Sequence, residues 1–139
     1  MGARRKAREC ALQVLFQADL NREAPDVVVF FEHHPVSRTI EEFATFLIEG
    51  WRKNAARIDQ IIGRCSKNWS VERMGAVDRN VLRVAVFELL YGRTTPPKVV
   101  IDEAIEIAKK FGSSESHAFI NGVLDGVHKA RADLAAGSK

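Results

Sequence analysis

The sequence predicts an all-α protein, a single compact domain of about seven helices. Apolar residues recur at helical spacing along most of the chain, and no segment shows sustained strand alternation. At 139 residues the chain is long enough to bury roughly two-thirds of its unfolded surface in one domain. Turn and capping residues divide the pattern into segments, which we group into two helical halves, about 1–68 and about 69–133.

The first helix is expected from Arg5 to Asn21. At about 100° per residue, one of its faces carries mostly small apolar side chains, which allow another helix to approach closely. Those residues are Ala7, Cys10, Ala11, Val14, Leu15 and Ala18. Leu12 and Phe16 point almost the opposite way. The helix is therefore either sandwiched between two partners or presents an aromatic ring on its free face.

The middle of the chain predicts a connection followed by a long helical region. Residues 22–38 form a linker or a short helix between two prolines. The next helix is expected at Thr39, whose hydroxyl can cap it while Glu42 reaches back. Its apolar stripe continues to about Ser66 as one long helix or two stacked ones, and Gly50 is the expected interruption.

The C-terminal half carries the clearest helical signals. Residues 76–92 are apolar nearly all round, apart from an arginine stripe, which predicts the buried central helix of the fold. Pro97 is placed to open the following helix, and Gly112 is placed to end it. A last helix is expected from about Ser114.

The net charge of the chain is localised at its N-terminus. The sequence holds 21 Lys and Arg against 18 Asp and Glu, a net charge of +3. Residues 1–10 contain Arg4, Arg5, Lys6 and Arg8 against Glu9 alone, so they account for the whole surplus. Cations at a helix N-terminus oppose the helix dipole. A basic arm on a neutral body is typical of a protein that binds a polyanion, and the competing interpretation is a merely solvated or disordered terminus.

No catalytic or metal-binding set is evident. His33 and His34 are adjacent, whereas a metal pair on a helix needs an i, i+4 spacing, and neither cysteine has a nearby partner. Ser116 and His117 lack the glycines of a nucleophile elbow. No apolar run approaches the about 20 residues of a membrane span. We therefore expect a cytoplasmic protein that is not an enzyme and needs no cofactor or metal.

Sequence-selective binding of single-stranded RNA usually requires aromatic side chains on which bases can stack. Phe16, beside the basic arm, and Phe119, within SHAFING, are the candidates. Phe119 has a competing interpretation as part of the core of the last helix.

Two long blocks in the C-terminal half, together with the opening of the chain, resemble a known family. The patterns VDR..LR.A.FELLY, DEAIEIAK.FG and SH.F.NGVLD, together with the opening ARRKARECALQVLFQ, are similar to the NusB transcription antitermination factors. The resemblance covers the first ~20 residues and about 76–127. It implies an all-helical fold of two subdomains that binds the single-stranded boxA element of ribosomal RNA leader transcripts. The implied partners are the ribosomal protein NusE and the RNA polymerase antitermination complex.

The resemblance also implies site residues. The RNA-binding positions are Arg4, Arg5, Lys6 and Arg8 on phosphates, Phe16 near the RNA and partner surface, and Glu115 and Phe119 in the RNA-facing loop and last helix. The partner-binding positions, which face NusE, are Glu72 and Asp78.

Two alternative functions stay open at this point. A similar helical domain is fused to RNA cytosine methyltransferases, so the chain could be the RNA-binding partner of an rRNA-modifying enzyme. It could also be a homodimerising helical module, with Leu12, Phe16 and Leu20 as the self-interface.

Overall fold

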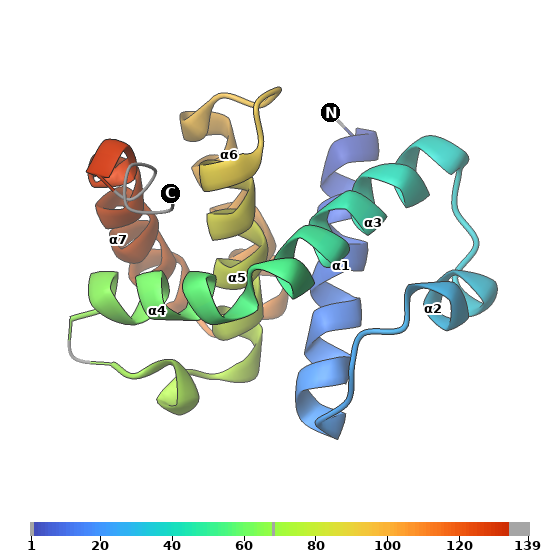
Figure 1. The fold of residues 1–139 in the computed structure, drawn as a ribbon, viewed down its shortest axis with the longest axis horizontal. Helices are drawn as coiled ribbons and strands as arrows, with labels where there is room; N and C mark the ends of the chain where they lie inside the picture. Colours follow the sequence, from blue (N-terminus) through green and yellow to red (C-terminus); the bar gives the residue numbers. More distant parts are fainter. Residues whose placement is uncertain (1, 68, 134–139) are drawn as a thin grey trace.

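Seven α-helices and one short 3₁₀ turn make up the described part of the chain, and no strand occurs in that part (Figure 1). The computed structural model describes residues 2–67 and 69–133. In order, the elements are α1 (Gly2–Asn21), α2 (Val27–His33), α3 (Arg38–Lys53), α4 (Ala55–Cys65), η1 (Val71–Arg73), α5 (Ala76–Tyr91), α6 (Pro97–Phe111) and α7 (Ser116–Lys129). The predicted all-α class is confirmed. Within those described ranges, none of the helices combines the length and apolarity of a membrane span.

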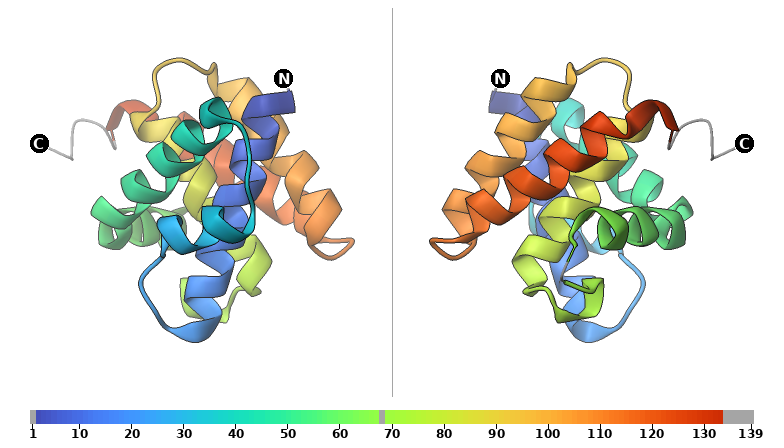
Figure 2. Two further views of the ribbon diagram at one scale, coloured as in Figure 1. Left: turned by 90° about the vertical axis from the view of Figure 1, so that its right-hand side faces the viewer. Right: turned by 90° about the vertical axis from the view of Figure 1, so that its left-hand side faces the viewer.

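Helix α5 lies at the centre of the fold. It packs against α1, α3, α4, α6 and α7, which surround it in the views of Figures 1 and 2. From Asn80 to Leu89 every side chain except that of Arg83 is buried. The prediction of a buried central helix is therefore confirmed.

Helix α1 is covered on both of its long faces. The small-residue face is buried except at Ala18, which is half-buried, and Leu12 on the opposite face is only 4% exposed. Helix α1 packs against α3 and α5, and its ion pairs reach α6. The sandwiched interpretation of this helix is confirmed. Leu12 consequently lies in the core and cannot form a self-interface with Phe16 and Leu20.

The helices form two groups around α5. Helices α1 and α2 lie to the right of α5 in Figure 1, with most of α3, whereas α4 and α7 lie to its left and α6 overlaps α5 in this view. Helix α4 packs on α5 and α7, whereas α1 packs on α3. The division of the chain into two halves at about residue 68 stays a proposal. Helix α4 precedes that point in the sequence, but it packs on α5 and α7 of the second half.

The arginine stripe of α5 ties three elements together. Arg79 donates to the Asp19 carboxylate at 2.8 Å and to the main-chain carbonyl of Val71 at 3.1 Å. Asn80 donates to the same carboxylate at 2.9 Å, and Arg83 forms a two-bond pair with Asp59. Burial raises the pKa of Asp19, but the hydrogen bonds from Arg79 and Asn80 and the charges of Arg79 and Arg83 together outweigh it and hold the pKa below its ordinary value. The stripe therefore connects the end of α1, the turn η1 and α4 to the central helix.

Two predicted boundaries in the middle of the chain are wrong. The cap of α3 is Ser37 rather than Thr39, because the Ser37 hydroxyl accepts from the main-chain N–H of Ile40 at 3.4 Å. The interruption falls at Asn54 rather than Gly50. Gly50 lies inside α3, where a Cβ atom would overlap the ring of Phe87. This glycine is required by the close approach of α5 and does not break the helix.

The remaining boundaries shift by a few residues. Helix α1 begins at Gly2 instead of Arg5, and α7 begins at Ser116 instead of Ser114. The prolyl start of α6 and its glycine end are confirmed, since Pro97 is the first residue of α6 and the Gly112 N–H donates to the carbonyl of Ala108.

Candidate nucleic-acid interface

The four predicted RNA-binding cations lie on the first two turns of α1, and three of them reach different neighbouring helices. Figure 2 (left) shows α1 between α3 and α6. Arg4 points to α3, Arg8 to α5 and Arg5 to α6. Lys6 is exposed. The arm is therefore an anchored part of the fold.

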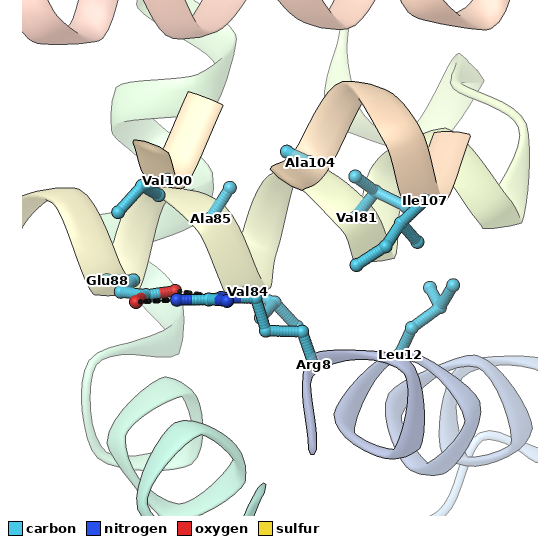
Figure 3. Close-up of a pocket in the computed structure, with 9 residues that line it drawn as sticks. All are labelled: Arg8, Leu12, Val81, Val84, Ala85, Glu88, Val100, Ala104 and Ile107. Atoms are coloured by element: carbon cyan, nitrogen blue, oxygen red, sulfur yellow. Dashed lines mark hydrogen bonds and ion pairs between the residues drawn. The ribbon is translucent and has the colours of Figure 1, made fainter. Parts of the chain in front are cut away.

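Arg8 is buried against the central helix. Its guanidinium donates two hydrogen bonds, of 2.8 and 2.7 Å, to the carboxylate of Glu88 (Figure 3). The two side chains are 5% and 2% exposed, and apolar residues such as Leu12 and Val84 line the surrounding hollow. A phosphate can reach this guanidinium only by displacing Glu88. Arg8 therefore holds the first helix on α5, and its guanidinium is already occupied by Glu88.

Arg5 is paired with α6 and remains partly accessible. It donates hydrogen bonds of 2.9 and 2.7 Å to Glu103, whose side chain is 6% exposed, while its own side chain is 44% exposed. The hydrogen bond from Arg5 holds the pKa of Glu103 below its ordinary value, against the effect of burial. The same contact raises the pKa of Arg5. Glu103 thus fixes the orientation of a cation that solvent still reaches.

The charge surplus of the first ten residues is partly neutralised by residues distant in sequence. Glu88 pairs with Arg8, and Glu103 pairs with Arg5 and also lies 3.8 Å from the guanidinium of Arg8. Glu9, the one acid of the arm, is in turn paired with Lys110 of α6 at 3.2 Å. The carboxylates of Glu88 and Glu103 offset the unfavourable position of the cations at the positive end of the helix dipole. They also leave a smaller free positive charge on Arg5 and Arg8 than the sequence indicates.

Arg4 and Lys6 have no ion pair among the described residues. Arg4 lies over the ring of Phe43, with its guanidinium carbon 3.9 Å from the ring centroid. It also donates a hydrogen bond of 3.5 Å to the Thr94 hydroxyl. Lys6 lies on the exposed surface of α1. The accessible positive charge of the arm comes from these two residues and from Arg5.

Phe16 shares a face of α1 with Arg5. The two residues are eleven positions apart, which on a regular helix gives nearly the same direction and a separation of about 16 Å along the axis. Phe16 is half-buried. Of the arm's cations, Arg5 therefore lies on the same face as Phe16, whereas Arg8 turns into the protein.

Glu115 and Phe119 lie at the start of α7. Glu115 is exposed and directly precedes the helix, and Phe119 is half-buried on its first turn and packs against the core. Phe119 also lines a surface hollow with Lys67 and Trp69. Trp69 is 53% exposed and is absent from the predicted site residues. A tryptophan within the polar stretch between two helices is the sequence signal that could have indicated it.

The two predicted partner-binding acids lie close together in sequence near the start of α5. Glu72 is exposed on η1, and Asp78 is half-buried in the first turn of α5. An acid in the first turn of a helix is favoured by the helix dipole. These acids lie outside the basic arm of α1, so the predicted partner and RNA positions belong to different elements.

Sequence comparison assigns the chain to a family. Residues 5–129 match the sequence model of the NusB family. The chain belongs to the NusB family. A transcription antitermination protein NusB from Syntrophus aciditrophicus (strain SB) is 44% identical over 130 residues, which cover 92% of this chain and 81% of that protein. The predicted family is confirmed, as is its role in transcription antitermination, and the family is not enzymatic.

Solved NusB structures share the fold. A structure of T. maritima NusB matches with a TM-score of 0.84 and 39% sequence identity, covering 93% of this chain and 92% of that one. A structure of the antitermination factors NusB and NusE in complex with dsRNA matches with a TM-score of 0.84 and 32% identity, covering 94% and 98% of the two chains.

Proposed function

We propose that this NusB-family chain binds boxA-type single-stranded RNA of rRNA leader transcripts together with NusE. The complex joins the RNA polymerase antitermination complex and suppresses premature termination. It acts in the cytoplasm, where these transcripts are made. Support comes from the NusB relative solved with NusE and RNA and from the accessible cations of α1.

The observation that carries the RNA-binding part is the cluster of accessible cations at one end of α1. Arg4, Arg5 and Lys6 are consecutive, and the ion pair with Glu103 orients the middle one. Cations of this kind neutralise phosphates and release counterions, which makes affinity depend on salt. In this proposal Arg8 contributes through the position of the helix, because Glu88 already occupies its guanidinium.

The other proposed contacts follow the family resemblance. Phe16, on the face of α1 that carries Arg5, and the pair Glu115 and Phe119 on the RNA side complete the RNA surface. Glu72 and Asp78 form the acidic part of the NusE surface. Complementary charge across such an interface favours both specificity and the rate of association.

A charge reversal at Lys6 tests the RNA surface. Lys6→Glu should weaken binding of a fluorescent boxA RNA, measured by anisotropy with NusE present. For single strands the salt slope should fall by about 0.7 for each phosphate that the variant no longer neutralises. Lys53→Glu is the matched control, since Lys53 is exposed at the far end of α3.

Equal affinities for the parent and the Lys6→Glu protein at every salt concentration would remove the arm from the RNA surface. A similar loss of affinity in the Lys53→Glu control would mean that the effect is one of net charge alone. Sedimentation of the same samples shows whether a self-associated form competes with RNA, as the homodimer alternative requires.

A further inference from the structure

A second surface with aromatic and cationic side chains lies where α1 meets α3. Between the start of α1, the first turns of α3 and the end of α5 is an open hollow of about 390 Å³. We call it the aromatic hollow and define it by Arg4, Phe43, Phe46, Tyr91 and Arg93. Arg5 and Glu9 of α1 pair instead with α6, so the hollow opens on a different side of the helix from those contacts.

The rings of the aromatic hollow form a continuous series. Phe43 and Phe46 stack with centroids 6.0 Å apart, Phe46 meets Phe87 edge-on at 5.2 Å, and Phe87 stacks on Tyr91 at 5.4 Å. All three distances lie in the range of favourable aromatic pairs. Phe87 is buried and forms the base of the series, whereas Phe46 is 46% exposed. Helix α3 buries a different set of residues in the core, so Phe46 lies at the edge of the core with its ring partly exposed.

The charge at the aromatic hollow is positive. Arg4 already stacks on Phe43. Arg93 is exposed on the loop before α6 and has no ion pair among the described residues. The acid that reaches the hollow is Glu88, and Arg8 neutralises it through two short hydrogen bonds. The hollow therefore combines partly exposed aromatic rings, those of Phe46 and Tyr91, with two guanidinium groups.

We propose that the aromatic hollow binds nucleotides of single-stranded RNA that flank the boxA element. Single-strand binding sites combine a cationic track for phosphates with aromatic faces on which bases stack, and they tolerate different base sequences. Phe46 and Tyr91 supply the stacking faces. Arg4 and Arg93 contact the phosphates on either side of the stacked base. The hollow thus lengthens the RNA footprint without adding to its sequence specificity.

Continuity with the arm favours RNA over another occupant. Arg4 belongs to the hollow and directly precedes Arg5 and Lys6, so a strand that crosses the first turn of α1 passes from one cation to the next. The inference rests on the proposed RNA-binding function and goes beyond it by assigning a second contact region. Binding of a second copy of the chain at the hollow would instead bring two such cationic patches together, and the repulsion between like charges disfavours that contact.

The test compares RNAs of two lengths on the full chain with NusE present. One labelled RNA is the boxA element alone, and the others carry a short oligouridine run at the 5′ or the 3′ end. The variants are Phe46→Ser and Arg93→Gln. Val28→Ser is the control, because Val28 is an apolar side chain on α2 that is 72% exposed and lies outside the hollow.

We expect one of the lengthened RNAs to bind the parent protein about tenfold more tightly than the short RNA. One stacked base contributes on the order of fivefold to hundredfold by substitution of its aromatic partner. Phe46→Ser should abolish that increase in affinity and leave the affinity for the short RNA unchanged. Arg93→Gln should reduce the increase and its salt dependence, and Val28→Ser should preserve it.

Three outcomes overturn the inference. If the short RNA binds but neither extension adds affinity, the hollow is not an RNA site, and the proposed function still stands. If Phe46→Ser changes only self-association in sedimentation, the hollow is an interface between copies. If none of the RNAs binds, the proposed function fails and this inference fails with it.

Discussion

Replacing Arg8 by methionine should destabilise the protein strongly while leaving the RNA surface chemically intact. The substitution removes two charge-assisted hydrogen bonds of 2.8 and 2.7 Å and leaves the Glu88 side chain, which is 2% exposed, without its counter-charge. Removing one partner of a buried ion pair costs about 3–5 kcal/mol. That is a large share of the roughly 5–15 kcal/mol that holds a domain folded. Urea unfolding followed by circular dichroism measures the destabilisation.

The double variant Arg8→Met with Glu88→Leu separates the two possible roles of Arg8. Replacing both charges by apolar side chains is often neutral or stabilising, and the hollow around the pair is lined by apolar residues such as Val84 and Val100. The stability of the double variant should therefore return to within about 1 kcal/mol of that of the parent. Its affinity for boxA RNA should stay within about threefold of the parent's, because Arg8 is expected to contact no phosphate. A single variant that costs less than about 1 kcal/mol would refute the anchoring role. A stable double variant that fails to bind RNA would show that Arg8 is a direct phosphate contact.

Three further predictions concern the pH dependence, the core and the partner surface. The folded pKa of Glu103 lies below the ordinary 4.5, so the stability that its charged form contributes is present above that pH and is lost as the pH falls through the folded pKa. The difference in stability between the parent and Glu103→Gln, measured by urea unfolding from pH 7 downward, should therefore shrink below about pH 4.5. A difference that stays constant with pH would contradict the pairing. Gly50→Ala should destabilise the protein by about 1–3 kcal/mol, because the added Cβ overpacks against the ring of Phe87 on α5. Gly122→Ala in α7, where an added Cβ meets no atom within 4 Å, should instead stabilise it by up to about 1 kcal/mol. Thermal unfolding measures both variants, and equal shifts in Tm would contradict the close approach of α3 and α5. Asp78→Lys should weaken NusE binding in calorimetry through charge repulsion, and an equal weakening for Asp102→Lys, an exposed acid on α6, would mean that the effect is not local.

The helical architecture could be predicted from local patterns because its signals are local. The nearly continuous apolar run of α5 indicates burial on all sides, and Pro97 and Gly112 bound α6 by their own backbone properties. The predicted start of α3 was wrong because two nearby residues can both cap the helix. Ser37 and Thr39 are both hydroxyl caps two residues apart, and the sequence pattern does not show which one the chain uses.

The errors with functional consequences come from contacts between distant residues. Gly50 looks like a helix interruption because its reason, the ring of Phe87, comes from another helix. The charge of the arm looks unbalanced because Glu88 and Glu103, which pair with Arg8 and Arg5, are 80 and 98 residues away. Helical spacing alone does not reveal such pairs. The family and its antitermination role were predictable from the spacing of two long motifs, whereas the division of the arm into buried and accessible cations required the structure.

The binding of labelled boxA RNA by the parent protein, with and without NusE across a range of salt concentrations, tests the central claim most directly. We predict tighter binding with NusE and a steady fall of affinity with salt. The three accessible cations Arg4, Arg5 and Lys6 correspond to a logarithmic slope of about −2 for a single strand when each contacts one phosphate. Affinity that does not change with salt, or that is the same for boxA and for an unrelated strand with NusE present, would contradict the proposed RNA-binding role.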